Sequence, residues 1–300
     1  MNFFKRNTRQ NYDIYSFYSW FVPGIKGMFI LLALLIVGAC LGSLVTNALK
    51  IFGDIDNSYS MLLSYPIMFI PPMVASGYLS SRNIAFEKGY ALDNNHFGKY
   101  SVWITALLLI ASTSMSTFLL DLINSVLPKM PERLKDLMDS LLQGNIWVNA
   151  ISVCIFAPFF EEWLCRGMIL RGLLNHRRKD GTSMKPIWAI IISALFFAVI
   201  HFNPWQAIPA FLLGCFMGFV YYKTGSLKFT MLIHFVNNAI ALIMGNIANF
   251  KDAESWRDIL PENIFFLLCI ISIIIIAITC IYIAKTIKVV RPQGSCKEII

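Results

Sequence analysis

Hydrophobic residues in this chain are gathered into eight long runs separated by short polar connections. Each run is long enough, or nearly so, to cross the roughly 30 Å hydrocarbon core of a bilayer as a helix. The second run contains Pro66, Pro71 and Pro72, so we expect that helix to be kinked or broken. The pattern predicts an all-α polytopic membrane protein with about eight transmembrane helices, over residues 27–49, 60–79, 101–124, 146–174, 187–205, 206–222, 228–248 and 263–284.

Two further segments have a different pattern. Residues 1–24 are first basic and then aromatic, which is typical of a membrane interface and not of a cleaved signal peptide. Residues 129–143 alternate charges with Leu and Met, which predicts a short amphipathic helix lying at the interface. The chain thus divides into an N-terminal segment, N-terminal helices without a recognised motif, a motif-bearing core, and a last helix with a basic tail, at 1–26, 27–144, 145–250 and 251–300.

The composition agrees with a membrane protein. Hydrophobic residues make up 57% of the chain and charged residues only 14%, whereas soluble domains carry about 25% charged residues. So few polar residues cannot coat a soluble globule of this size, which excludes a cytosolic enzyme, a disordered chain and an ordinary nucleic-acid binder. The seven cysteines form no CxxC pair, which argues against a thiolate zinc site.

The formal net charge of +8 is mainly an orientation signal. With the N-terminus in the cytoplasm and eight crossings, most Lys and Arg residues fall in cytoplasmic segments. This asymmetry predicts that both termini are cytoplasmic. The expected location of the protein is a bacterial inner membrane. Arg166 lies within the bilayer, and the outer segments hold only Lys50, Lys129, Arg133, Lys135, Lys251 and Arg257.

Ionisable side chains inside an apolar helix are costly and mark candidate functional sites. Glu162 and Arg166 are four residues apart in the fourth run, so they share a helix face and can form an ion pair. Glu161 points about 100° away from that face. An unpaired carboxylate suits general acid–base catalysis. The alternative is a purely structural ion pair, with Glu161 bonded to a neighbour.

The fifth and seventh runs add two histidines. Phe197 and His201 share a helix face, and His201 comes level with Glu161 if the fourth and fifth runs form an antiparallel hairpin. His234 and Asn238 also share a face. His234 lies only about 10 Å from the cytoplasmic end of its run, so it meets the others only if the fourth and fifth runs extend into the cytoplasm. Hydrogen-bonded structural residues are the alternative for both histidines.

These residues together predict peptide hydrolysis without a covalent intermediate. A water molecule held between Glu161 and His201 can be deprotonated and directed at a peptide carbonyl, and His234 and Asn238 can stabilise the oxyanion that forms. Glu162, Arg166 and Phe197 are the expected supporting residues. The partners expected are a membrane-associated protein or peptide substrate and the lipid bilayer, and no nucleic acid.

The three motifs resemble those of the type II CaaX-protease and bacteriocin-processing family of intramembrane endopeptidases, the CPBP or Abi family. E-E-x-x-x-R, F-x-x-x-H and H-x-x-x-N occur here in order, each inside its own apolar run. The resemblance covers about residues 145–250. It implies an eight-span helical fold with an intramembrane polar cavity, Glu161 as the water-activating base assisted by His201, and His234 and Asn238 as the oxyanion site.

The resemblance leaves the cofactor and two other functions open. Members have been described both as metalloproteases and as glutamate proteases. Glu161, His201 and His234 would be a legitimate zinc set, but no H-E-x-x-H pattern accompanies them, so we expect no required metal, with zinc as the alternative. A non-catalytic scaffold or bacteriocin-immunity-type protein could use the same fold. A transporter would require matching broken helices, and the proline-rich second run has no counterpart.

Overall fold

The computed structural model describes residues 16–53, 57–83, 92–93, 101–142, 144–176, 181–246 and 255–287. Within these ranges the regular elements are helices, and there is no strand. Among the described residues, seven helices are long and apolar enough to cross a membrane, and an eighth apolar helix is shorter. The prediction of an all-α polytopic membrane protein is therefore confirmed.

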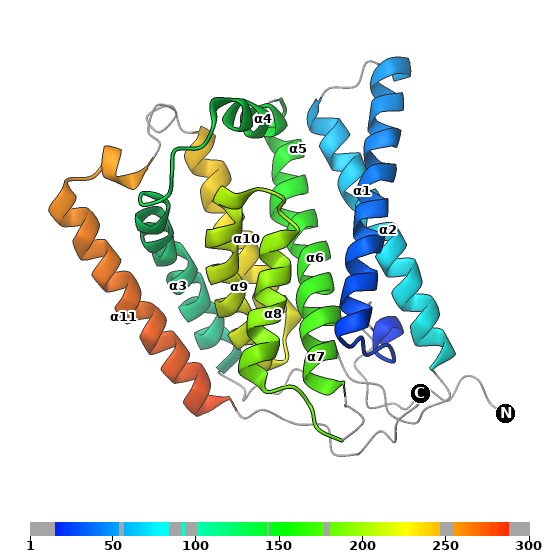
Figure 1. Cartoon of the computed structure of the whole chain (residues 1–300). Coiled ribbons are helices and arrows are strands. Elements are labelled where there is room, and N and C mark those ends of the chain that lie inside the picture. The colour runs from blue at the N-terminus through cyan, green and yellow to red at the C-terminus, as the bar shows by residue number, and fades with distance from the viewer. Residues whose placement is uncertain are drawn as a thin grey trace.

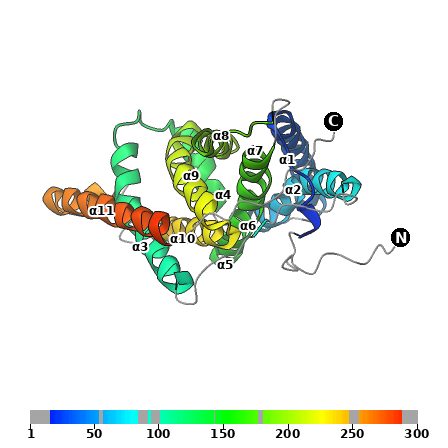
Figure 2. The same ribbon diagram turned by 90° about the horizontal axis from the view of Figure 1, so that it is seen from below.

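The long helices form three groups (Figure 1). α1 (Ile25–Gly53) and α2 (Asn57–Arg82) pack as a hairpin on one side of the molecule. α3 (Ser101–Asn124) and α11 (Glu262–Thr286) pack together on the other side. The motif-bearing helices lie between the two pairs, as the view from below also shows (Figure 2).

α2 is not broken, although it contains Pro66, Pro71 and Pro72. The assigned helix continues from Asn57 to Arg82 through all three prolines. A proline removes one backbone hydrogen bond, but neighbouring helices and local adjustments can compensate in a membrane helix. The expected break is therefore absent from this structure.

The fourth run forms one long helix, the motif helix, from Ile146 to Asn175. It is made of α5 (Ile146–Ala150), α6 (Ala157–Glu162) and α7 (Arg171–Asn175), joined by two π-helical stretches at Ile151–Phe156 and Trp163–Leu170. Of its most apolar 18-residue window, 61% is buried, against 17–33% for the other six spanning helices. The motif helix is thus the most enclosed of the spanning helices described, and the others turn apolar side chains outward, as lipid contact requires.

The fifth run departs from the predicted boundaries. α8 (Pro186–Val199) has 14 residues, and α9 (Pro204–Thr224) begins two residues before the predicted start. α8 is therefore about 21 Å long and too short to span the hydrocarbon core. Asn203 caps the start of α9, because its side-chain oxygen accepts a hydrogen bond from the Trp205 backbone N–H (3.1 Å). A proline also disfavours the helical conformation of the residue before it, so Pro204 separates the two helices.

The predicted amphipathic helix is present as α4 (Glu132–Leu142). It lies near the turn between α8 and α9, at the upper end of the molecule in Figure 1. The Trp205 indole N–H donates to the Pro128 carbonyl just before α4 (2.6 Å), and the Asn203 amide approaches Met138 Sδ (3.5 Å). α4 therefore covers the end of the bundle at which α8 and α9 meet.

α10 (Leu227–Asn246) completes the core, and a short helical turn, η5 (Trp256–Asp258), precedes α11. α10 packs against α3, α9 and the motif helix. The motif helix, α8 and α10 therefore carry the predicted site residues on elements that are close in space.

Candidate active site

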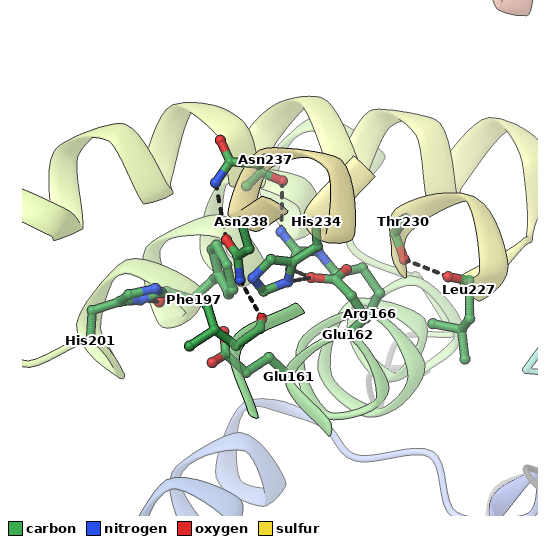
Figure 3. A network of polar contacts seen from close by, with 12 residues as sticks. Glu161, Glu162, Arg166, Phe197, His201, Leu227, Thr230, His234, Asn237 and Asn238 are labelled. Atoms are coloured by element: carbon green, nitrogen blue, oxygen red, sulfur yellow. Dashed lines mark hydrogen bonds and ion pairs between the residues drawn. The ribbon is translucent and has the colours of Figure 1, made fainter. Parts of the chain in front are cut away.

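Glu162 is the centre of a fully buried charged network (Figure 3). Its Oε1 accepts a hydrogen bond from Arg166 Nη1 at 2.7 Å, and neither side chain is exposed. The same oxygen lies 3.1 Å from Nδ1 of His234 on α10. The predicted pairing of Glu162 with Arg166 is confirmed. The contact with His234 also shows that the motif helix and α10 bring these two residues to the same level.

The Arg166 guanidinium has two further neighbours. Nη2 donates to the Gly214 carbonyl of α9 at 3.2 Å, and the guanidinium carbon lies 4.5 Å from the centre of the Phe197 ring. Gly214 permits this approach, because a Cβ atom there would be 3.3 Å from Nη2. A buried charge requires such compensation. Arg166 therefore holds α8, α9 and the motif helix around Glu162.

The contact with Glu162 determines which nitrogen of His234 carries the proton. A carboxylate only accepts hydrogen bonds, so Nδ1 is the donor and, in the neutral imidazole, Nε2 is an acceptor. His234 can donate from Nε2 to an oxyanion only when both nitrogens are protonated. The Glu162 oxygen can accept the Nδ1 proton in either form of the ring.

Glu161 belongs to a separate network. The residue is 8% exposed, and its Oε1 accepts a hydrogen bond from the Tyr65 hydroxyl of α2. The other oxygen, Oε2, is buried and has no hydrogen-bond partner within the described part of the chain. The two adjacent carboxylates are thus separated as predicted, one neutralised by Arg166 and one facing elsewhere.

His201 lies in the turn after α8 and not inside a helix. Its Nδ1 is 2.7 Å from the Phe197 carbonyl, so this nitrogen donates and Nε2 is the acceptor in the neutral ring. The Phe197 ring lies 4.9 Å from the His201 ring and 5.5 Å from the His234 ring. Figure 3 shows His201 at one edge of the group and Glu161 at another. A water shared between Glu161 and His201 remains a prediction.

Asn238 bonds to the backbone of the motif helix. In the first π-helical stretch the Ala157 N–H donates to Ser152, five residues back, and Pro158 has no N–H. The Val153 carbonyl is therefore left without a helical donor, and Asn238 Nδ2 donates to it at 2.8 Å. Asn237 Nδ2 in turn donates to Asn238 Oδ1 at 3.1 Å. An amide nitrogen has two hydrogens, so Asn238 keeps one donor for another acceptor.

The three possible metal ligands do not form a metal site here. Among the described residues, no group of three or more His, Cys, Asp or Glu side chains is arranged to hold a metal ion. The Nδ1 contacts of His201 and His234 and the Tyr65 contact of Glu161 leave Nε2 of both rings and Oε2 of Glu161 as possible donors, so it is the spacing of the three side chains that does not suit a metal ion. The structure therefore does not fit the zinc set Glu161, His201 and His234.

The structure brings together most of the predicted site residues and adds others. Phe197 contacts both histidines and Arg166. Tyr65 was missed because it lies on a helix without a motif, and a tyrosine in an apolar run is no signal by itself. Asn237 was missed although it directly precedes Asn238, because polar side chains on adjacent positions of a helix usually point apart.

One comparison with known proteins identifies the core. Residues 143–240 match the family model of the type II CAAX prenyl endopeptidases described as Rce1-like. No curated protein and no solved structure matches the chain. The matched residues include all three motifs.

The central segment is Rce1-like. This confirms the family that the three motifs predicted, and the family implies protease activity. With its apolar helices, the chain is an integral membrane protein, and its residues 143–240 are similar to the CAAX-type endopeptidases.

Proposed function

We propose that this chain is an intramembrane endopeptidase that hydrolyses a peptide bond near the membrane by means of a water activated by Glu161 and His201. The observation that carries the proposal is the different surroundings of the two adjacent glutamates. Glu162 is neutralised by Arg166 and also contacts His234, whereas Glu161 accepts a hydrogen bond from the neutral Tyr65 hydroxyl. Within the described residues, Oε2 of each glutamate is buried without a hydrogen-bond partner, and that of Glu161 belongs to the carboxylate that Arg166 does not neutralise. A general base needs such a free oxygen within reach of the water it deprotonates.

The proposed reaction balances as a simple hydrolysis. Glu161 takes one proton from water as the water oxygen attacks the peptide carbonyl carbon, and the carbonyl oxygen becomes the oxyanion. The C–N bond then breaks, and the proton on Glu161 passes to the leaving amine. His201 presents Nε2 as an acceptor and can orient the second hydrogen of the water. No bond to a protein side chain forms.

His234 and Asn238 are the proposed oxyanion donors. His234 donates from Nε2 in its doubly protonated form, beside the Glu162 carboxylate. Asn238 donates with the amide hydrogen that does not face Val153. Both side chains come from α10, one helical turn apart, so they can be directed at the same oxygen.

We propose further that the reaction requires no metal. The support is the arrangement of the side chains: among the described residues, no three or more His, Cys, Asp or Glu side chains are grouped so that they could hold a metal ion. Metal analysis of the purified protein and cleavage in the presence of a chelator test it. Activity that falls with chelation and returns on addition of zinc would contradict it.

The experiment uses the full chain in liposomes with two quenched fluorescent peptides. One peptide carries a farnesylated cysteine in a CaaX tail, which the name of the matched family suggests, and the other has the same sequence without the lipid. Glu161→Gln should lower cleavage by about 100-fold or more, and His201→Ala and His234→Ala should also lower it strongly. Glu132→Gln changes an exposed glutamate on α4 and should have no effect.

Retention of normal cleavage by Glu161→Gln would contradict the proposed base. Cleavage of the lipid-free peptide alone would place the substrate among unmodified membrane peptides.

A further inference from the structure

The N-terminal half of the chain contributes a side chain to the candidate active site. Tyr65 on α2 lies well outside the matched residues 143–240, yet its hydroxyl donates a hydrogen bond to Glu161 Oε1. Within the described part of the chain, this hydroxyl is the hydrogen-bond partner of the Glu161 carboxylate. The orientation of Glu161 therefore depends on a helix that carries none of the three motifs.

The hydrogen bond distinguishes the two oxygens of Glu161. Oε1 accepts from the Tyr65 hydroxyl, and Oε2 is buried with no hydrogen-bond partner among the residues that the structure describes. A glutamate side chain has three rotatable bonds, and fixing one oxygen limits the positions that the other can take. Tyr65 thus presents Oε2 as the oxygen free to accept a proton.

The Tyr65 hydroxyl is itself held in place by aromatic packing. The Tyr65 ring contacts the Phe69 ring one helical turn further on, with centroids 5.6 Å apart. Phe69 is fully buried and stacks on Phe160 of α6, at 5.1 Å and an interplanar angle of 16°. Phe160 directly precedes Glu161, so this aromatic contact ties α2 to the motif helix at the position of the carboxylate.

We propose that Tyr65 is a positioning residue that orients the Glu161 carboxylate for water activation. This inference rests on the proposed function of Glu161 as the base. The competing explanation is that the hydroxyl only helps α2 to dock on α6. Docking would require the ring packing more than the hydroxyl, because the rings bury most of the contact area.

The test compares Tyr65→Phe with Tyr78→Phe in the full chain in liposomes, using the farnesylated quenched peptide and its lipid-free form. Tyr65→Phe removes only the hydroxyl, and Tyr78 is a 62% exposed tyrosine on the same helix. We expect Tyr65→Phe to lower kcat about tenfold, the effect of losing one hydrogen bond to a charged group, while KM stays near that of the wild type and the melting temperature falls by a few degrees at most. Tyr78→Phe should change none of these values.

A second measurement does not depend on turnover. The infrared band of the Glu161 carboxyl group is obtained from the difference between the wild type and Glu161→Gln. Tyr65→Phe should shift this band. 3-Fluorotyrosine incorporated at position 65 keeps the hydroxyl, so this protein should keep the band at the wild-type position and the wild-type kcat. This analogue also covers the case in which Tyr65→Phe does not fold.

An unchanged Glu161 band in Tyr65→Phe, or a kcat equal to or above that of the wild type, would overturn the inference. If kcat/KM and the melting temperature both fall while the band stays unchanged, Tyr65 has a docking role only, and the inference is also overturned. If Glu161→Gln still cleaves the peptide, the proposed function fails, whereas the infrared band reports separately on whether Tyr65 controls Glu161.

Discussion

Glu162 and His234 are 72 residues apart in the sequence and are joined by a contact of 3.1 Å between Oε1 and Nδ1. The same Glu162 oxygen accepts from Arg166. Glu162 therefore connects the first motif to the third, and it sets the orientation of the His234 ring. Its role is distinct from that of Glu161, although the two residues are adjacent.

Replacing Glu162 should affect stability as well as activity. Glu162→Gln leaves the buried Arg166 without a counter-charge, which costs about 3–5 kcal/mol when a buried pair is broken. We expect a large fall in melting temperature in thermal unfolding of the purified protein, together with loss of cleavage. Glu262→Gln removes one partner of the exposed pair with Arg257 (3.3 Å) and should leave the melting temperature nearly unchanged. Equal melting temperatures for the two variants would contradict a buried network.

Asn238 should contribute to the stability of the motif helix. Asn238→Leu leaves the Val153 carbonyl without a donor, and an unsatisfied buried polar group costs about 1–3 kcal/mol. The melting temperature should fall by several degrees. The control is Asn246→Leu, at the exposed end of the same helix, which should be nearly neutral. A neutral Asn238→Leu would mean that the Val153 carbonyl finds another donor.

A methyl group at Gly214 should disturb Arg166. A Cβ atom there would lie 3.1 Å from Ala194 Cβ and 3.3 Å from Arg166 Nη2. Because the packing has little room to relax, Gly214→Ala should destabilise the protein by about 1–3 kcal/mol, as overpacking of a core does. Gly245→Ala is the matched control, since nothing lies within 4 Å of its Cβ position. Thermal unfolding compares the two variants. A Gly214→Ala variant that is more stable than Gly245→Ala would contradict the prediction.

Arg171 should hold residues 18–21 against the motif helix. Arg171 is 2% exposed, and its guanidinium donates to backbone carbonyls of Gly167 (2.7 Å), Ser19 (3.0 Å) and Phe21. Arg171→Gln loses most of these bonds, so limited proteolysis with chymotrypsin should cut after the aromatic residues of this segment several-fold faster. Arg82→Gln changes an exposed arginine and should leave the rate as it is. An unchanged rate in Arg171→Gln would show that the aromatic packing suffices.

Thiol labelling should reveal opposite sides of the membrane for two loops. α4 lies at the upper end of the molecule and α8 begins at the lower end (Figure 1). In the sequence, Lys129 precedes α4 and Lys185 precedes α8. We propose that the lower end is cytoplasmic, as the positive charges predict. In a chain whose native cysteines are replaced, an impermeant maleimide added outside intact cells should label Lys129→Cys and not Lys185→Cys. The reverse labelling would invert the orientation.

Local rules were sufficient for the Glu162–Arg166 pair. Residues four apart in a helix are neighbours whatever packs around them, so the sequence alone predicts their contact. The sequence also contained the signal that ends α8, because Asn203 and Pro204 are typical of a helix start. The apolar residues on both sides obscured it, and the predicted run continued to residue 205.

The periodicity of the chain determined the membrane class, the apolar helices and the faces that carry Glu161, Glu162, His234 and Asn238. Only the tertiary structure decided which helix each face meets. Tyr65 on Glu161, His234 on Glu162 and Asn238 on the Val153 carbonyl are contacts between distant segments. Periodicity fixes the direction of a side chain around its own helix axis, whereas its partner depends on how the helices pack, and several apolar helices could have filled each place.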